Sequence, residues 1–303
     1  MVARFLFCAL FAASQLSAEP AVKLFGGWIA GCNNENICTA IRPVWDAIDG
    51  LPLNDGMPFV QIRHHPQRGS TPEITLIDQS NPAPDAILKP PLAAIMIHYD
   101  VRDKNYNCRG SCVGHISLFQ AHIDGKGGYR IKDEDARSVL YGLRQGIKVE
   151  VALGDRPALP LDTAKLDEAL AHFDREQELE DTPGALVLRP ENVMYDYAHP
   201  VPPEAETVVL TAFSISQLNS WRVEYPESMP GETIYSEPDP SRGTVLLVRA
   251  RSPDGDCGIL EQWGHVGAGN DFVLFERREM PVCNGIAPQH WIQTYRANRI
   301  SPE

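Results

Sequence analysis

The sequence predicts a mainly β chain with a few short helices, in which a β-sandwich-like N-terminal domain precedes a smaller, disulfide-stapled β-rich C-terminal domain. Three observations predict this class. The chain of 303 residues holds 25 Pro and 23 Gly and shows no long helical pattern. Short segments with alternating apolar residues recur along it, as in β-strands. The roughly 285 residues that follow an N-terminal signal exceed the usual size of one domain.

The N-terminus reads as a secretory signal peptide over residues 1–18. Arg4 precedes an apolar run over residues 5–13, and small residues lead to a cleavage position at Ala18. A retained membrane anchor is the alternative, but Ser14 ends the apolar run too early for a span. We therefore expect export to the periplasm, followed by a first domain over residues 19–155 and a second over residues 156–303.

The cysteine count supports an oxidising compartment. Removal of the signal leaves an even number of cysteines, for which three disulfides are the default expectation in an exported chain: Cys32, Cys38, Cys108, Cys112, Cys257 and Cys283. Six cysteines allow fifteen sets of pairings. Proximity in the sequence favours the bridges Cys32–Cys38, Cys108–Cys112 and Cys257–Cys283. A bridge between the last two would contribute about 3–4 kcal/mol by the chain-entropy argument.

The charge balance bears on the choice of partners. The chain has 27 basic and 40 acidic residues, a net charge of −13, and loss of Arg4 with the signal makes the mature chain more acidic still. A negative field repels phosphate backbones and anionic membrane surfaces, so nucleic acid is excluded as an expected partner. No stretch of the mature chain is apolar enough to span a membrane.

The first domain alternates in the manner of an antiparallel sheet and carries one helix. Strands are expected over residues 23–31, 59–65, 73–78, 92–99, 113–122 and 148–153. A helix is expected over residues 133–146, with Asp133 as its N-cap and Gly146 as its C-terminal stop. Ala136, Leu140 and Leu143 then share its buried face. An Asn-rich loop pinned between Cys32 and Cys38 serves as a turn.

The second domain opens with another helix after a break over residues 154–160. Asp162 is its expected cap, and Leu166, Leu170 and Phe173 form one buried stripe. We assign His172 and the charged run 174–181 mostly to a solvated face. Further strands are expected over residues 185–188, 206–215, 244–249 and 271–276, and residues 225–242 read as a long exposed loop. Four aromatic residues are expected to anchor the structure: Trp28, Trp263, Phe272 and Trp291.

No motif of known chemistry is present, and no cofactor is expected. His98, His115 and His122 lie on neighbouring predicted strands and are the only histidine trio to test as metal ligands, although roles in the core or at the surface are favoured for them. His64 and His65 point to opposite faces of one strand and do not predict a metal site; a surface ion pair is favoured for one of them.

Residues 103–112 match neither a calcium-binding loop nor the cysteine pair of a thiol oxidoreductase. Asp103, Asn105 and Asn107 have the spacing that opens a calcium loop, but the required Gly and the closing Glu are missing. The three residues between Cys108 and Cys112 depart from the Cys-x-x-Cys spacing of thiol oxidoreductases. A structural bridge is favoured over a redox pair.

The chain resembles two families of exported bacterial proteins. Its beginning, with Phe25-Gly-Gly-Trp28 and Cys32-Asn33-Asn34, and its end, with Gly255-Asp256-Cys257-Gly258 and Arg278-Glu279-Met280-Pro-Val-Cys283, resemble the domain of unknown function 1176 family. The first half is weakly similar to the invasion-associated locus B proteins, which implies an exported β-sandwich-like domain. Neither resemblance implies a catalytic residue.

These observations favour a non-catalytic binding or interaction protein of the cell envelope, whose partner is an envelope protein or a small ligand. The segment from Ser228 to Arg242 is the expected presenting surface. An envelope hydrolase, with or without an assisting metal, that has its site near the three histidines is the alternative. A thiol oxidoreductase that uses Cys108 and Cys112 is a third hypothesis.

Overall fold

A computed structural model describes residues 21–44, 58–66, 71–79, 93–99, 115–123, 128–146, 148–154, 157–182, 184–187, 206–224 and 232–300. The expected signal peptide and the expected bridge between Cys108 and Cys112 lie outside these residues. Within them, no helix is both long and apolar enough to cross a membrane.

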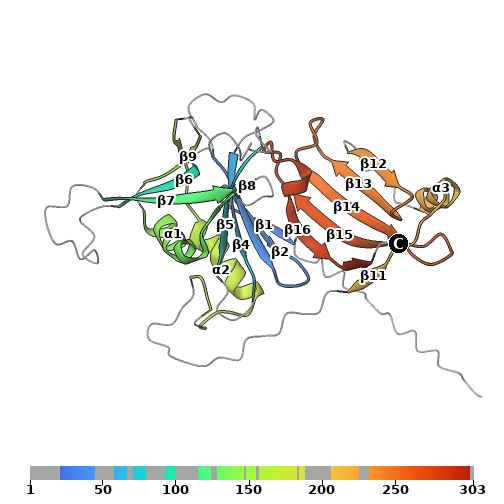
Figure 1. The fold of residues 1–303 in the computed structure, drawn as a ribbon, viewed down its shortest axis with the longest axis horizontal. Coiled ribbons are helices and arrows are strands. Elements are labelled where there is room, and N and C mark those ends of the chain that lie inside the picture. Colours follow the sequence, from blue (N-terminus) through green and yellow to red (C-terminus); the bar gives the residue numbers. More distant parts are fainter. Residues whose placement is uncertain are drawn as a thin grey trace, which may run out of the picture.

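The chain is mainly β, as predicted, and its two large sheets are antiparallel (Figure 1). The first has the order β1-β2-β3-β4-β5-β8-β7-β6-β9-β10. Its strands are β1 (Val22–Phe25), β2 (Trp28–Cys32), β3 (Cys38–Pro43), β4 (Pro58–His64), β5 (Glu73–Asp78), β6 (Ala93–Tyr99), β7 (His115–Ile123), β8 (Gly128–Ile131), β9 (Lys148–Leu153) and β10 (Leu159–Pro160).

The second sheet has the order β12-β13-β14-β15-β16, and a short parallel pair flanks it. Its strands are β12 (Thr233–Asp239), β13 (Thr244–Ala250), β14 (Gly258–His265), β15 (Phe272–Met280) and β16 (Ile292–Arg296). The parallel pair is β11 (Thr207–Val209) and β17 (Asn298–Ile300). The helices are α1 (Asp133–Gln145), α2 (Leu166–Glu176), α3 (Ile215–Glu224) and the 3₁₀ turn η1 (Pro288–His290).

One face of the first sheet carries the larger core. Alternation along β4 turns Val60 and Ile62 to this face, where α1 and α2 pack and Trp28 is fully buried. The predicted buried faces of both helices are confirmed. Gly146 ends α1 as predicted, but the predicted N-caps are wrong. Asp133 is the first residue of α1 and bonds Arg130, and Lys165, with a left-handed backbone, precedes α2.

The opposite face of the same sheet packs against the second sheet. We call this second cluster the inter-sheet cluster: from the first sheet it takes Val22, Ile29, Ile41, Phe59 and Ile77, and from the C-terminal part Cys257, Leu260, Met280, Ile286, Trp291 and Ile292. β2 lies beside β16 there (Figure 1). A Cβ at Gly31 would come within 2.5 Å of a backbone oxygen and 3.0 Å of the Ile292 side chain, so this close approach requires glycine.

Residues beyond position 155, the predicted boundary, contribute to the larger core through α2 and Leu186. The expected solvated face of this segment is confirmed for Arg175, Glu176, Glu178, Glu180 and Asp181, which are exposed, but it is wrong for the polar residues His172, Asp174 and Gln177. Asp174 is fully buried and accepts backbone hydrogen bonds from Leu186 at 2.7 Å and Val187 at 2.9 Å. His172 is also buried, and so is His64, whose Nδ1 lies 2.7 Å from Oε1 of Gln177. Residues 185–187 form a turn held by Asp174 rather than a strand.

The C-terminal hairpin of β14 and β15 confirms the expected strand over residues 271–276 and is joined at its open end by the Cys257–Cys283 disulfide. Two expectations for this half are wrong. Residues 233–239 form the edge strand β12 rather than a loop, although most of its side chains are exposed as predicted. The segment predicted as a strand over 206–215 contains only β11, and α3 begins at its end.

The buried carboxylate of Asp174 yields a stability prediction. We expect Asp174→Ala to lower the free energy of unfolding by about 2–3 kcal/mol, because two buried N–H groups lose a charged acceptor. Asp167→Ala on the same helix is the matched control. It removes an exposed ion pair with Arg144, so we expect a loss below about 1 kcal/mol. Urea unfolding of both variants measures the difference, and equal losses would contradict the prediction.

Candidate functional site

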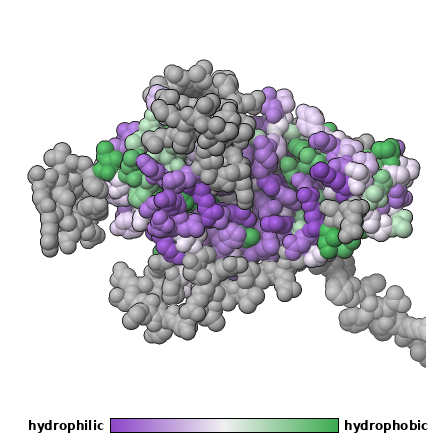
Figure 2. All heavy atoms as spheres, viewed as in Figure 1, coloured by the Kyte–Doolittle hydropathy of each residue, from purple (hydrophilic) through white to green (hydrophobic). Residues whose placement is uncertain are grey.

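A polar cleft of about 550 Å³ opens where the two sheets meet. Hydrophilic residues gather along this seam on the face drawn in Figure 2. Both halves of the chain line the cleft, with Asn33, Ile37, Thr39, Gln61 and Arg63 from the first and Phe275, Glu276, Arg278, Gln289, His290, Trp291, Gln293, Arg296, Ala297, Asn298 and Arg299 from the second. Its volume falls in the range of small-molecule sites.

Strand alternation explains how the first sheet contributes. Phe59, Gln61 and Arg63 point to one face of β4, opposite the residues that fill the larger core. Phe59 joins the inter-sheet cluster, whereas Gln61 and Arg63 lie further along the strand and line the cleft. Thr39, the cross-strand partner of Arg63, lies beside it on β3. The cleft therefore begins where the inter-sheet cluster ends.

The second sheet contributes in the same way. Glu276, Arg278 and Met280 alternate along one face of β15. Met280 is buried in the inter-sheet cluster, and the two charged residues line the cleft. Arg296 lies opposite Glu276 on the neighbouring strand β16.

Two side-chain amides bind the halves together at this seam. Asn34 donates to the backbone oxygen of Arg296 at 2.8 Å and accepts from its N–H at 2.7 Å. Gln79 donates to Gly285 O at 2.9 Å and accepts from Ala287 N–H at 2.7 Å. Each amide thus mimics a strand pairing and fixes the position of the cleft wall.

The loop that presents Asn34 is built as the sequence predicts. The Cys32–Cys38 disulfide closes it. Within the loop, Oδ1 of Asn33 accepts hydrogen bonds from the N–H groups of Glu35 at 3.0 Å and Ile37 at 2.9 Å. The bridge therefore shapes a contact between the two halves as well as a turn.

The cleft has a surplus of positive charge. Its lining includes four arginines and one glutamate. That glutamate, Glu276, accepts from Nε of Arg278 at 2.5 Å and from Nε2 of Gln293 at 3.2 Å. Arg278 also donates to the backbone oxygen of Gln289. The guanidinium of Arg299 lies 5.5 Å from the centre of the Phe275 ring, a cation–π contact.

Arg63 and Arg296 form no ion pair with any of the described residues. The pKa of Arg63 is lowered, and burial is the largest cause. The positive charges of Arg296 and Arg278 also lower this pKa, whereas the negative charges of Glu73 and Glu35 raise it. The guanidiniums from the two halves therefore repel one another across the seam.

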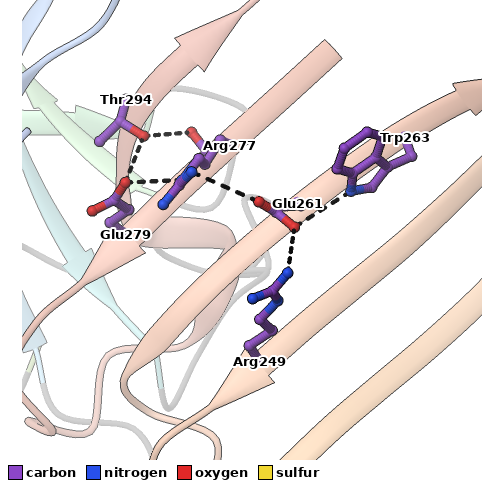
Figure 3. A network of polar contacts seen from close by, with 6 residues as sticks. All are labelled: Arg249, Glu261, Trp263, Arg277, Glu279 and Thr294. Carbon is purple, nitrogen blue, oxygen red and sulfur yellow. Dashed lines mark hydrogen bonds and ion pairs between the residues drawn. The ribbon is translucent and has the colours of Figure 1, made fainter. Parts of the chain in front are cut away.

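Other arginines of the second sheet are differently placed (Figure 3). The buried carboxylate of Glu261 lies 3.9 Å from Arg249 and 3.8 Å from Arg277, and Glu279 lies 2.9 Å from Nε of Arg277. Trp263 also donates to Glu261, at 3.4 Å. Acidic partners thus compensate these arginines, which contrasts with Arg63 and Arg296.

The structure separates the histidines that the sequence singled out. His98 pairs in register with Ile116, six residues from His122 on the same strand, a distance of roughly 20 Å along a strand. His115 pairs in register with Tyr99, the residue after His98 on β6. His98 lies 2.8 Å from a carboxylate oxygen of Glu150. The separation of His98 from His122 is enough to keep the predicted trio from meeting at one point.

The described residues contain one group with metal-ligand atoms close together, formed by Asp256, Cys257 and Cys283. The two sulfurs are joined to each other in the disulfide. Asp256 accepts hydrogen bonds from Ser252 and from Gly285 N–H at 2.8 Å. This group therefore supports the chain turn beside the bridge.

The four expected aromatic anchors occupy different sites. Trp28 is fully buried in the larger core, and Trp291 is buried between the sheets, where its Nε1 donates to Ile286 O at 2.7 Å. Trp263 and Phe272 pack in a third cluster near α3. Trp291 alone among the four lines the cleft.

Sequence reasoning missed the arginines of the cleft. The sequence signal that could have revealed them lies on β4. One face of this strand carries Val60 and Ile62, and the other face begins with the apolar Phe59 and continues with the polar Gln61 and Arg63. A strand whose second face changes from apolar to polar indicates a partial contact with another layer. The sequence did not indicate which segment supplies that layer.

Comparisons with known proteins add little to this geometry. No family model matches the chain, so membership of the domain of unknown function 1176 family stays a prediction, and no curated protein matches it. The chain is weakly similar to the crystal structure of invasion associated protein B from Bartonella henselae. The TM-score is 0.31 and the identity 12%, over 52% of this chain and 98% of that chain. We draw no conclusion about activity from a similarity this weak.

The cleft histidine yields a pH prediction. Burial, and then the charge of Arg278, lower the pKa of His290. The unfolded chain therefore takes up a proton near pH 6.5 that the folded chain does not yet bind, so this residue lowers stability as pH falls below about 6.5. We expect His290→Gln to lose less stability than the wild type between pH 7 and pH 5. Denaturant midpoints measure the slope, with exposed His122→Gln as the control, and an unchanged slope in the cleft variant would contradict the assignment.

Proposed function

We propose that this protein is a non-catalytic binding protein of the cell envelope, and that the cleft between its two sheets holds a small polar ligand. One observation carries the proposal: a polar cavity of about 550 Å³ whose walls come from both halves of the chain. Ligand sites occur preferentially at such junctions, where converging polar groups set the orientation of the ligand.

The lining consists of groups suited to recognition. Gln61, Gln289 and Gln293 offer amides, which both donate and accept hydrogen bonds, and Thr39 adds a hydroxyl. The bonds of Asn34 and Gln79 across the seam hold the walls in place before a ligand arrives. A wall fixed in advance reduces the entropy lost on binding.

The location in the envelope is part of the proposal. A signal-like N-terminus and two disulfides between described residues support it, because disulfides persist in oxidising compartments. The hydrolase hypothesis gains no support from the described histidines, since their register keeps them apart.

Nuclear magnetic resonance tests the proposed site. We expect at least one solute from a panel of sugars, amino acids, dicarboxylates and phosphates to shift the indole resonance of Trp291 and the ring resonances of His290. Trp221 is the internal control, because it packs in the cluster near α3 and does not line the cleft. A panel that leaves Trp291 and His290 unmoved, or that shifts only Trp221, would refute a ligand site in this cleft.

A further inference from the structure

The charge of the cleft opposes the charge of the chain as a whole. Acidic residues outnumber basic ones by 40 to 27 over the full sequence, yet arginines outnumber carboxylates four to one in the cleft lining. The single carboxylate, Glu276, is already bonded to Arg278. The remaining positive charge therefore has no counterpart within the lining itself.

The arrangement of these arginines is unfavourable for an empty protein. Arg63 is half-buried on a central strand. The charges of Glu73, opposite it on β5, and Glu35 offset its own in part, whereas those of Arg296 and Arg278 oppose it. Burial of a charged group is costly when no counter-charge pairs with it. Arg249 and Arg277 on the second sheet show that this fold supplies acidic partners to arginines elsewhere.

Two of these guanidiniums, those of Arg278 and Arg299, are anchored before any ligand binds. Arg278 is held by Glu276 and by the backbone of Gln289. Arg299 lies over the ring of Phe275, and the backbone of Arg296 is fixed by the Asn34 amide. Guanidinium groups bind carboxylate and phosphate oxygens in a planar, two-pronged geometry, and anchoring reduces the entropy cost of such contacts.

We infer that the ligand of the cleft is a small polyanion with at least two carboxylate or phosphate groups, which Arg63 of the first sheet and Arg296 of the second bind together. The inference rests on the proposed function and names its ligand class. The ligand supplies a counter-charge between the two halves, while the amide of Gln61 in the same lining can bond its hydroxyl groups. No bond is made or broken in this binding step.

Calorimetric titration of the oxidised chain over residues 19–303 tests the inference, with citrate as the carboxylate probe and pyrophosphate as the phosphate probe. The ionic strength is kept constant, because salt screens exposed charges. We expect one of the probes to bind, and Arg63→Gln and Arg296→Gln each to weaken its binding about 10- to 100-fold through loss of a charged hydrogen-bonding group.

Arg242→Gln is the matched control, because it removes the same charge from an exposed arginine outside the cleft. We expect it to change the affinity for the probe less than about twofold, as screened surface charges contribute little. A loss of affinity equal to that of the cleft variants would show that only net charge matters and would overturn the inference.

The thermal stability of the empty protein provides a second readout. Burial and the charges of Arg296 and Arg278 act against the charged form of Arg63, and Glu73 and Glu35 offset them only in part. We therefore expect the melting temperature of Arg63→Gln without ligand to equal or exceed that of the wild type, even though the variant binds the probe more weakly. A well-folded variant with weak binding assigns the arginine to recognition. A lower melting temperature would contradict the inference that the charge of Arg63 is only partly compensated in the empty protein.

The outcomes separate this inference from the function on which it rests. If neutral sugars or amino acids shift the resonances of Trp291 and His290 while citrate and pyrophosphate do not bind, the polyanion is refuted and the ligand site stands. If citrate or pyrophosphate binds but neither Arg63→Gln nor Arg296→Gln weakens its binding, the polyanion site in this cleft is refuted. If no solute binds in the cleft, both proposals fail.

Discussion

The apolar contact between the outer face of the first sheet and the second sheet is the interaction on which the rest of the structure depends. An antiparallel sheet can leave one face in water, but here α1 and α2 cover one face while Trp291, Ile292 and their neighbours cover part of the other. The two halves are thereby packed on one shared cluster. The cleft exists because this contact stops partway along β4, where the outward residues change from Phe59 to Gln61 and Arg63.

The seam combines two opposing effects. Burial of apolar side chains and the paired amide bonds of Asn34 and Gln79 draw the halves together. The guanidiniums of Arg63 and Arg296 repel each other across the same seam. Proteins retain such unfavourable groups where function requires them, and other interactions offset their cost. Under the proposed function, the fixed walls and the partly compensated charge together form one preformed site for an anionic ligand.

Local patterns predicted much of the fold. Alternating residues located β4, β5, β6, β7 and β9 of the first sheet and the strand β15 of the C-terminal hairpin, but the single strand predicted over residues 23–31 is a hairpin of β1 and β2. Helical spacing identified the buried faces of α1 and α2. The same reasoning failed for Asp174, because a charged run on a helix usually faces water. Its burial depends on a turn at residues 185–187, whose N–H groups require an acceptor. The edge strand β12 was missed because proline and acidic residues are typical of loops.

The sequence by itself determined the class of structure, the two described disulfides and the residues that face each side of a strand. The period of two that governs a strand and the proximity of paired cysteines are local properties of the chain. Only the tertiary structure decided that Arg63 faces Arg278 and Arg296, and that the predicted histidines lie apart. The physical reason is that the register and packing of sheets depend on contacts between distant segments. No local sequence pattern specifies which segment packs against the outward face of a given strand.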